Sequence, residues 1–514
     1  MPEKSLPTLT LSILSDNFLG SPVANYPRQL LDLPVRAVQF GEGNFLRAFV
    51  DWIFHQMNKA GVFNGRITVI QPIRPGRVPE LNAQDGLYTT LLRGIQGGEV
   101  TEEREIIPTL SHGLEAYPQW DQVLSLAEKK DLQLVISNTT EAGITYNSED
   151  RLTSTPPESF PGKLTAFLYH RFQHFDGREE SGLVMLPVEL IKQNGSTLKE
   201  MVLKLAGDWQ LPDEFTDWVN RSNIFLNTLV DRIVPGYPAE EAPKIQEELG
   251  YRDANMVAGE IYHQWYIEGD SRLRELLPFH QADLNVKWVD DLQPYRTRKV
   301  RILNGLHTST VPVAFLGGID TVRDAVQDEM VSSFMQQMLE EEIIPVMDDD
   351  PAELRSFGDD VFERFNNPFI AHQWLDISLN SISKFTTRVM PSLRDYFSRH
   401  QSPPPFISFS LAALLAFYRG EELRDGVLIG TRENQEYAIR DDDSILRIFQ
   451  NLWQDYDQGS LNLSTLVSSL LGNEDLWGEN LNRYGNLTPT VTNNLRNILN
   501  KGLGTALADL LSAG

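Results

Sequence analysis

The sequence predicts an α/β protein with a doubly wound parallel sheet in its N-terminal part and a mostly α-helical C-terminal part. In the first part, short apolar runs rich in β-branched residues alternate with helical stretches, a pattern typical of βαβ units. Beyond about residue 290, strand-like runs become rare and apolar residues recur at helical spacing. We therefore expect an N-terminal extension over residues 1–30, an α/β domain over 31–290 and a helical domain over 291–514.

The first strand–turn–helix unit is the clearest element. We expect a strand over residues 35–40 (VRAVQF), a turn over 41–44 (GEGN) and a helix over 45–61, whose apolar residues recur near helical period. Further strands are expected over 66–73 (RITVIQPI), 132–138 (LQLVISN) and 183–190 (LVMLPVEL). In the C-terminal part, periodicity predicts helices over 325–345, 359–384, 405–420, 443–456 and 490–512.

Composition narrows the range of functions. The chain has 514 residues, and its 71 acidic and 45 basic side chains give a formal net charge of −26. Nucleic-acid binding needs a basic stripe that neutralises phosphates, so we expect no nucleic-acid partner. An anionic substrate would need a locally basic pocket, because the overall charge does not attract it.

Other absences in the sequence also restrict the chemistry. Without cysteine there are no disulfides, no thiolate metal site and no cysteine nucleophile.

The first residues lack a basic segment followed by a continuous apolar stretch, so we expect no secretory signal. The apolar part of SFSLAALLAFYRG is about ten residues long, whereas a helix that spans a bilayer needs about 20. We therefore expect a cytoplasmic protein with no membrane partner.

A glycine turn joins the first strand to the first helix. Its two glycines allow a tight turn and a close approach of the backbone to a pyrophosphate, whose charge suits a helix N-terminus. The motif is incomplete because Leu46 stands where a third glycine is usual. Dinucleotide binding competes with an ordinary glycine turn, and the position in the first βα unit favours binding. The cofactor contacts expected here are Phe40, Gly41, Glu42, Gly43, Asn44, Phe45 and Arg47, with Arg47 supplying charge to a phosphate.

The second strand lacks the acid that commonly binds the adenosine ribose at its end. Gln71, Arg74 and Arg77 stand near this position instead. Arginines here could accommodate a 2′-phosphate or could be ordinary loop charges. We expect NAD as the cofactor, with Gln71 in contact with it, and NADP is the alternative.

A polar stretch follows the strand at 132–138, where ligands collect in open α/β sheets. Thr139, Thr140 and Glu141 could contact the cofactor or the substrate, or could start an ordinary helix. We include all three among the expected cofactor contacts.

The stretch KVRILNGLH (299–307) is the most informative one. A lysine acts as an acid or base near neutral pH when desolvation or cationic neighbours lower its pKa, and arginines and apolar residues flank Lys299. In a helix, Asn304 and His307 share a face at i, i+3, and Lys299 lies about 7.5 Å of rise below Asn304. The asparagine amide could stabilise an oxyanion, and the histidine could hold a hydroxyl group. The alternative is an ordinary helix with a solvated basic start.

A metal site is not expected. His170 and His174 stand at i, i+4, but without an intervening glutamate or a plausible third ligand. The sequence therefore predicts metal-free chemistry.

These stretches together resemble the polyol-specific long-chain dehydrogenase/reductase family, which includes mannitol dehydrogenase. The K-x₄-N-x₂-H element formed by Lys299, Asn304 and His307 is the most specific part of the resemblance. The resemblance implies a Rossmann-type domain, a helical C-terminal domain and a metal-independent active site that uses a nicotinamide dinucleotide. The stretches that carry it run in family order over nearly the whole chain: 38–52, 84–94, 138–144, 228–238, 299–315, 364–385 and 411–421.

The resemblance also implies roles for single residues. Lys299 matches the general acid/base, Asn304 an oxyanion-stabilising group and His307 a substrate-positioning group. A second family asparagine is replaced by Glu189, with Asn194 nearby, and Arg296 replaces a family glutamate three positions before the lysine. The substrate contacts expected are Glu189, Asn194, Asp231, Arg296, Lys384 and Arg388.

The changed charges fit a sugar acid better than a neutral polyol. With the resemblance, they imply a reductase that converts a keto-hexuronate to an aldonate, D-tagaturonate and NADH to D-altronate and NAD. The alternatives are the reduction of fructuronate and a mannitol-type polyol dehydrogenase. A more remote alternative is a non-catalytic dinucleotide-binding regulator.

Overall fold

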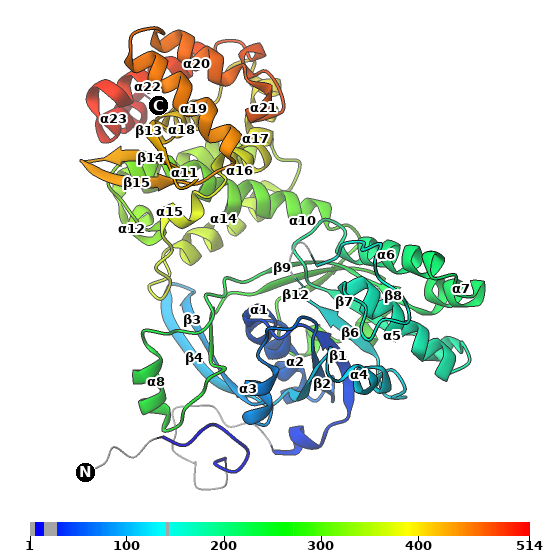
Figure 1. Ribbon diagram of the computed structural model, residues 1–514. Coiled ribbons are helices and arrows are strands. Elements are labelled where there is room, and N and C mark those ends of the chain that lie inside the picture. Colours follow the sequence, from blue (N-terminus) through cyan, green and yellow to red (C-terminus); the bar gives the residue numbers. More distant parts are fainter. Residues whose placement is uncertain (1–5, 15–27, 140–142, 271, 514) are drawn as a thin grey trace. The chain divides into compact units, whose positions relative to one another are not determined.

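The computed structural model describes residues 6–14, 28–139, 143–270 and 272–513 (Figure 1). Contacts between residues divide the chain into two compact units, Met1–Leu292 and Gln293–Gly514. The sequence placed this boundary between residues 290 and 291. Each unit is described by itself below.

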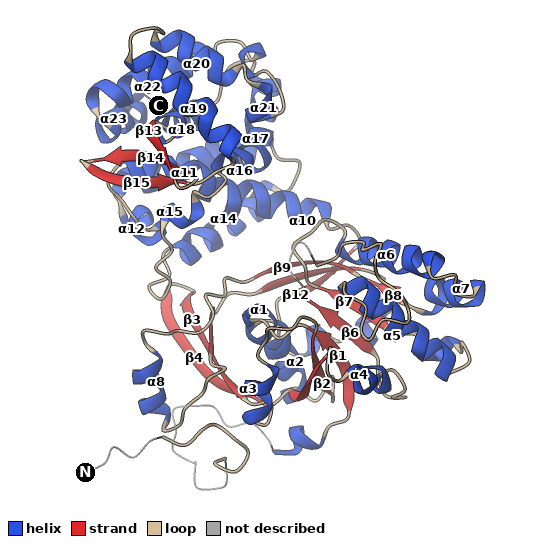
Figure 2. Ribbon diagram, viewed as in Figure 1, coloured by secondary structure: helices blue, strands red, loops and turns tan. Residues whose placement is uncertain are grey.

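The first unit is built around a parallel sheet (Figure 2). In the described part of the chain this sheet has six strands in the order β5-β2-β1-β6-β7-β8, and every neighbouring pair is parallel. The strands expected at 35–40, 66–73, 132–138 and 183–190 are β1, β2, β6 and β7, so the predicted Rossmann-type fold is confirmed. The bounds are β1 Val35–Phe40, β2 Arg66–Gln71, β5 Leu110–Glu115, β6 Leu134–Ser137, β7 Val184–Pro187 and β8 Ile224–Phe225.

Helices cover both faces of this sheet. Ala37 of β1 joins an apolar core with the first helices, whereas the next residue, Val38, joins a separate core with α4 to α7. This alternation follows from the period of two along a strand and explains why the strands carry apolar residues on both faces. The helices are α1 Asn44–Ala48, α2 Val50–Lys59, α3 Val78–Ala83, α4 Trp120–Leu126, α5 Phe160–His174, α6 Asn194–Asp208 and α7 Asp213–Ser222.

The helix expected over residues 45–61 is divided into α1 and α2. The division falls at Phe49, whose backbone leaves helical geometry with φ −121° and ψ −71°. The Phe49 ring stacks on Phe45 with centroids 5.0 Å apart and also packs against Trp265. The first helix is therefore a short segment that directly follows the glycine turn.

Two smaller sheets in the first unit were not expected from the sequence. One has the strand order β10-β3-β4 and the other β12-β11-β9. In the N-terminal extension, Leu9 is buried and its N–H donates to the carbonyl of Arg252 at 2.8 Å. The remaining elements are η2 Arg28–Asp32, β3 Tyr88–Gln96, β4 Glu99–Ile107, η3 Glu179–Ser181, β9 Asn227–Asp231, α8 Ala242–Leu249, β10 Val257–Glu260, β11 Gln264–Glu268, α9 Leu273–Leu276, η4 Phe279–Gln281 and β12 Val286–Val289.

The second unit is mostly helical, as predicted. Its core forms around α11 and α18, whose side chains are buried almost all round, and the two helices pack against each other. The elements up to α18 are α10 Gln293–Arg298, η5 Lys299–Asn304, α11 Gly305–Leu316, α12 Val322–Gln327, α13 Glu329–Gln337, η6 Met338–Ile343, η7 Ile344–Val346, α14 Pro351–Phe365, α15 Trp374–Ile377, α16 Ser381–Arg388, α17 Met390–His400 and α18 Pro405–Phe417.

The C-terminal part of this unit contains a three-stranded antiparallel sheet that periodicity did not reveal. The helix expected over 359–384 is also interrupted, because Pro368 follows α14 and Asn380 adopts a left-handed φ of 56° before α16. The remaining elements are β13 Gly420–Arg424, β14 Val427–Arg432, β15 Gln435–Ile439, α19 Asp443–Asp457, α20 Leu463–Leu471, α21 Glu474–Trp477, η8 Leu481–Arg483, α22 Leu487–Lys501 and α23 Leu503–Ala513.

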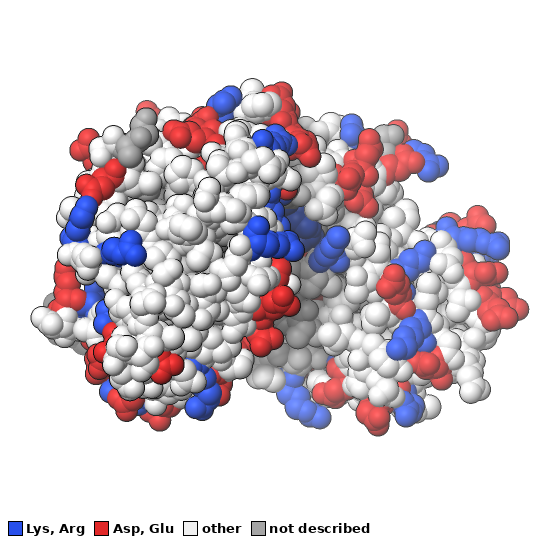
Figure 3. All heavy atoms as spheres, turned by 90° about the horizontal axis from the view of Figure 1, so that it is seen from above, with Lys and Arg blue, Asp and Glu red and all other residues white. Residues whose placement is uncertain are grey.

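The surface carries charges of both signs. On the face shown in Figure 3, acidic and basic side chains stand in small groups among uncharged residues. Among the helices of the described segments, none combines the length and apolar character needed to cross a bilayer.

Candidate functional site

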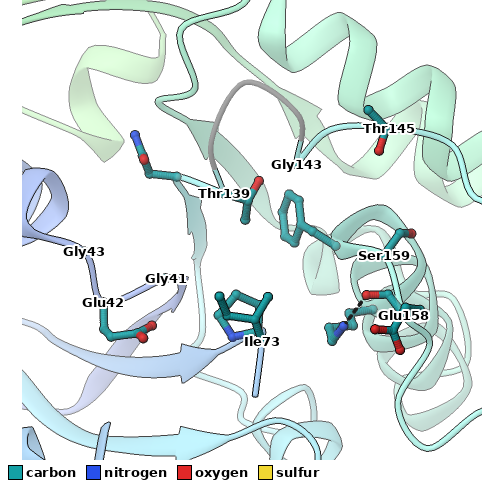
Figure 4. Close-up of a pocket in the computed structure, with 13 residues that line it drawn as sticks. Gly41, Glu42, Gly43, Ile73, Thr139, Gly143, Thr145, Glu158 and Ser159 are labelled. Carbon is teal, nitrogen blue, oxygen red and sulfur yellow. Dashed lines mark hydrogen bonds between the residues drawn. The ribbon is translucent and has the colours of Figure 1, made fainter. Parts of the chain in front are cut away.

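A cavity of about 340 Å³ lies in the first unit, at the carboxyl ends of β1, β2 and β6 (Figure 4). This is the edge of an open α/β sheet at which ligands bind, on either side of the point where the strand order reverses. The described residues that line it are Gly41, Glu42, Gly43, Pro72, Ile73, Asn138, Thr139, Gly143, Thr145, Glu158, Ser159, Phe160 and Lys163.

The glycine turn after β1 forms one wall of this cavity. Gly41 has a φ of +118°, and a Cβ added to it would lie 3.0 Å from the carbonyl oxygen of Asn138. Its own N–H donates to the carbonyl of Ile70 in β2 at 2.9 Å. A side chain at this position would therefore strain the backbone and push the turn away from β6. The carboxyl group of Glu42, next in the turn, has a raised pKa because it is largely buried.

Arg47 does not face the cavity, contrary to the expectation that it would contact a phosphate. Its side chain is 1% exposed, Nε donates to the carbonyl of Glu42 at 3.1 Å, and one terminal nitrogen donates to Asn44 Oδ1 at 2.7 Å. The other terminal nitrogen donates to the carbonyl of Asn255. Burial lowers the pKa of the guanidinium. Arg47 therefore braces the turn from behind, and Asn44 is engaged with it.

The two phenylalanines that flank the turn are packing residues. Phe40 is completely buried and packs against Phe160 with ring centroids 5.1 Å apart. Phe45 is half-buried and stacks on Phe49. The Phe40 side chain is therefore part of the core, which corrects its expected cofactor contact.

Gln71 ends β2 but points into its own loop. Its amide nitrogen donates to the carbonyls of Ile73 and Arg74 at 3.0 Å each, and its amide oxygen accepts from the N–H of Val78 at 3.2 Å. The side chain is 1% exposed. Gln71 therefore shapes the loop, and Pro72 and Ile73 line the cavity beside it; the contact between Gln71 and a cofactor stays a prediction.

The end of β6 is held by Glu189. Its carboxylate accepts from the N–H and the hydroxyl of Thr139, both at 3.0 Å, and from the Ser137 hydroxyl at 3.1 Å. Glu189 is buried, and burial raises its pKa. Thr139 lines the cavity, whereas Glu189 holds Thr139 from behind and is not among the described lining residues. The other two residues expected here, Thr140 and Glu141, lie outside the described residues.

Asn194 is hydrogen-bonded to the protein backbone on both sides of its amide, and its expected substrate contact stays a prediction. Its amide nitrogen donates to the carbonyls of Pro187 and Glu189 at 3.1 Å each, and its oxygen accepts from the N–H of Thr228 at 2.9 Å. It is completely buried. Asp231 is likewise buried, at the end of β9, where it pairs in register with Gln264.

The start of α5 contributes cavity residues that the sequence analysis missed. Ser159 caps this helix, since its hydroxyl accepts from the N–H of Gly162 at 3.0 Å. Lys163 is 1% exposed, donates to the carbonyl of Glu158 at 2.7 Å and has a pKa lowered to about 8 by burial. A serine followed closely by Pro161 is a typical helix start and could have indicated this wall.

In the second unit, Lys299 to Asn304 form a π-helix, η5, between α10 and α11. In an α-helix, residues five apart point about 140° away from each other. The i→i+5 repeat of a π-helix instead brings them close to one side, one turn apart. The π turn therefore reduces the angular separation between half-buried Lys299 and Asn304, and His307 continues that face at i, i+3.

Aromatic rings surround His307, which is 8% exposed. Its ring stacks on Phe365 with centroids 4.0 Å apart and an interplanar angle of 22°. His372 and Trp374 pack edge-on against it at 5.5 and 6.1 Å. These contacts fix the plane of the imidazole. The three aromatic neighbours were not identified from the sequence: Phe365 ends α14, and His372 and Trp374 come from the interrupted segment after it.

Cationic side chains from α16 lie near this segment, since α16 packs against η5 and α11. Arg388 donates to the hydroxyl of Thr308 at 3.5 Å, one residue after His307. Lys384 donates to the carbonyl of Ile377 at 2.8 Å, and its pKa is lowered by burial and by Arg388, with Asp441 opposing. Burial also lowers the pKa of Arg296 in α10. This unit thus supplies the locally basic region that an anionic substrate would need.

The paired histidines of α5 have other surroundings. His170 lies 2.9 Å from a carboxylate oxygen of Glu128, and His174 packs edge-on against Phe175. In the described segments, no three histidine, aspartate or glutamate side chains are grouped so that they could hold a metal ion.

Comparisons with known proteins agree with this division of the chain. The Rossmann domain of mannitol dehydrogenase matches residues 35–280, and the C-terminal domain of mannitol dehydrogenase matches residues 291–499. An altronate oxidoreductase of Halalkalibacterium halodurans is 46% identical over 481 residues, which cover 93% of this chain and 94% of that protein. An altronate oxidoreductase of Escherichia coli is 42% identical over 478 residues, covering 93% of this chain and 97% of that protein.

Two solved structures have a similar fold. The ternary complex of Pseudomonas fluorescens mannitol 2-dehydrogenase with NAD and D-mannitol has a TM-score of 0.68 at 21% identity and covers 96% of both chains. A substrate-free D-sorbitol dehydrogenase has a TM-score of 0.74 at 21% identity, covering 94% of this chain and 100% of that one. The chain therefore belongs to the mannitol dehydrogenase family and is a dehydrogenase that acts on CH–OH groups.

Proposed function

We propose that this protein reduces D-tagaturonate to D-altronate with NADH, and catalyses the reverse oxidation with NAD. The observation that carries the proposal is the combination of Lys299, Asn304 and His307 along η5 and α11 with the cations Lys384 and Arg388 on α16. The first three suit proton transfer to a carbonyl oxygen, and the last two suit a carboxylate on the same sugar. The name shared by the relatives at 42–46% identity supports the same reaction.

The cavity in the first unit fits a nicotinamide dinucleotide. Gly41 leaves the backbone of the turn accessible where a Cβ would fill the space, and Gly43 precedes the N-terminus of α1. Such a turn accommodates a pyrophosphate. When bound, the dinucleotide supplies or accepts the hydride of the reaction. Gly41, Gly43, Asn138 and Thr139 would hold it.

The proton chemistry is assigned to the second unit. As the ketone oxygen gains negative charge, the Asn304 amide donates a hydrogen bond to it and the Lys299 ammonium transfers a proton to it. In the reverse direction the neutral Lys299 amine takes the proton from the alcohol. His307 positions a hydroxyl group of the sugar, and its aromatic neighbours keep its ring in one orientation.

The carboxylate of the sugar acid is assigned to Arg388, Lys384 and Arg296. A guanidinium can bind a carboxylate through two parallel hydrogen bonds. These bonds fix the orientation of the carboxylate in addition to neutralising its charge. The mannitol-type alternative lacks a carboxylate, so these cations would have no partner on a polyol. This difference favours a sugar acid over a neutral polyol.

One assay tests the proposal. Oxidation of NADH is followed with D-tagaturonate, D-fructuronate and D-fructose as separate substrates. We expect D-tagaturonate to give the highest kcat/KM and D-fructose the lowest. A preference for D-fructuronate would replace the proposal with the sister reaction. A lack of turnover with both sugar acids would contradict it.

A further inference from the structure

Among the described residues that line the cavity of the first unit, Glu42 and Glu158 are the carboxylates, and Glu42 is the one that reaches the loop after β2. Its Oε1 accepts from the N–H of Arg77, in the loop after β2, at 3.3 Å. A Cβ added to Gly76 in the same loop would lie 2.3 Å from this oxygen. Figure 4 shows Glu42 beside Ile73, with Glu158 across the cavity near Ser159. An acid of the glycine turn after β1 thus extends to the end of the neighbouring strand.

This location has a defined use in Rossmann-type domains. An acid at the end of the second strand usually accepts hydrogen bonds from the hydroxyl groups of the adenosine ribose. Here the residue that ends β2, Gln71, is bonded to its own loop, and Pro72 and Ile73 follow. The strand itself therefore offers no acid, whereas the Glu42 carboxylate lies beside the same loop.

We propose that Glu42 replaces the missing acid of β2, accepts hydrogen bonds from the adenosine ribose and selects NAD over NADP. The inference rests on the proposed function only in requiring a nicotinamide dinucleotide in this cavity. A carboxylate that receives the 2′-hydroxyl would face the 2′-phosphate of NADP, and two groups of like charge in contact repel each other.

The nearby arginines do not offset this charge. The Arg74 guanidinium lies over the Tyr117 ring, 4.3 Å from its centroid, and Arg77 donates to the carbonyl of Ala254 at 3.1 Å. Neither belongs to the described lining of the cavity, which has Lys163 as its basic side chain. Lys163 belongs to α5 and donates to the carbonyl of Glu158 there. The part of the described lining that comes from the glycine turn and the loop after β2 therefore has Glu42 as its charged side chain.

Direct titration with NADH and with NADPH, followed by nucleotide fluorescence without any sugar, tests this inference. We expect wild-type protein to bind NADPH at least tenfold more weakly than NADH. Glu42→Gln keeps an acceptor for the Arg77 N–H but loses the charge, so NADH should bind several-fold more weakly and the ratio of the two dissociation constants should fall at least fivefold. Glu42→Ala should reduce the ratio at least as much, and circular dichroism confirms that both variants fold.

Glu80→Gln is the matched control, because it makes the same charge change at an exposed position of α3, outside the described lining of the cavity. It should leave the ratio unchanged. Equal binding of both nucleotides by wild-type protein, an unchanged ratio in both Glu42 variants, or a ratio that depends on Glu158→Gln instead would overturn the inference. Selective NADH binding without turnover of any sugar acid would overturn the proposed reaction but leave this inference standing, whereas failure to bind either nucleotide would overturn both.

Discussion

The guanidinium of Arg47 donates a 3.1 Å hydrogen bond to the carbonyl of Glu42, five residues before it and inside the glycine turn. A buried cation thus holds the backbone of the cavity wall from the side away from the cavity.

We predict that Arg47→Met weakens NADH binding at least tenfold and lowers the free energy of unfolding by about 3 kcal/mol, because several buried acceptors lose a charged donor. Isothermal titration and chemical denaturation measure the two effects. Arg77→Met, an exposed arginine in the loop after β2, should change stability by no more than about 0.5 kcal/mol. Weaker binding with unchanged stability would instead indicate that Arg47 contacts a phosphate.

Lys299→Ala should lower kcat about 10²- to 10⁴-fold, the usual contribution of a positioned acid or base. NADH affinity should be unchanged, because the cavity that fits the dinucleotide is formed by residues of the first unit. Lys299→Arg is the matched variant, since an arginine keeps the charge but does not release its proton. Steady-state kinetics and nucleotide titration separate the two effects. Full activity of Lys299→Arg would contradict proton transfer by this residue.

Arg388→Met should raise KM for the keto-hexuronate about 10- to 100-fold, the range expected when a charged group loses its hydrogen-bonded partner. Activity with a neutral ketose, where detectable, should change little. Arg394→Met, which removes an α17 arginine paired with Glu479 in the connection between α21 and η8, should leave KM unchanged. An equal loss with charged and neutral substrates would show that Arg388 acts on the fold through Thr308 and not on the carboxylate.

Glu342 should make the second unit less stable as pH rises. Its carboxylate accepts from the N–H groups of Phe406 and Ile407 at the start of α18, and burial raises its pKa to about 8. The folded state therefore binds more protons than the unfolded state between about pH 4.5 and 8, so this contribution is complete below that range and is lost as pH rises through it. Thermal unfolding of Glu342→Gln should depend less steeply on pH, so its loss of stability relative to wild-type protein should be largest at low pH and should shrink as pH rises towards 8. The pKa of Asp51 is also raised by burial, and this residue contributes equally to the pH dependence of stability in wild-type protein and in the variant. Parallel pH profiles of wild-type protein and the variant would contradict the assignment.

The parallel sheet was predictable because its strands are buried on both faces. β1, β2, β6 and β7 are short runs dominated by apolar and β-branched residues, so their composition identifies them. The sheet β13-β14-β15 was missed because its strands alternate with exposed charged residues and lack such runs. The left-handed pairs Asp425–Gly426 and Glu433–Asn434 mark its two tight turns and were the available signal.

The candidate site was only partly predictable, because residue type does not reveal the direction of a side chain. Gln71 ends β2, Glu189 follows β7 and Asn194 begins α6, positions at which ligand contacts are expected, but each side chain is hydrogen-bonded to protein atoms. The spacing of Lys299, Asn304 and His307 was visible in the sequence. The π turn was not visible in the sequence, because the apolar residues of this segment still follow a pattern expected of a helix.

That turn gives the number of residues in the segment a role of its own. A π turn contains one residue more than the α turn that it replaces, so deleting Val300 would allow uninterrupted α geometry. The deletion would leave every charged side chain in place, yet it would rotate Arg296 by about 100° around the axis relative to His307. Under the proposed mechanism, the number of residues between Arg296 and His307 would therefore affect reactivity, and point substitutions would not reveal this effect.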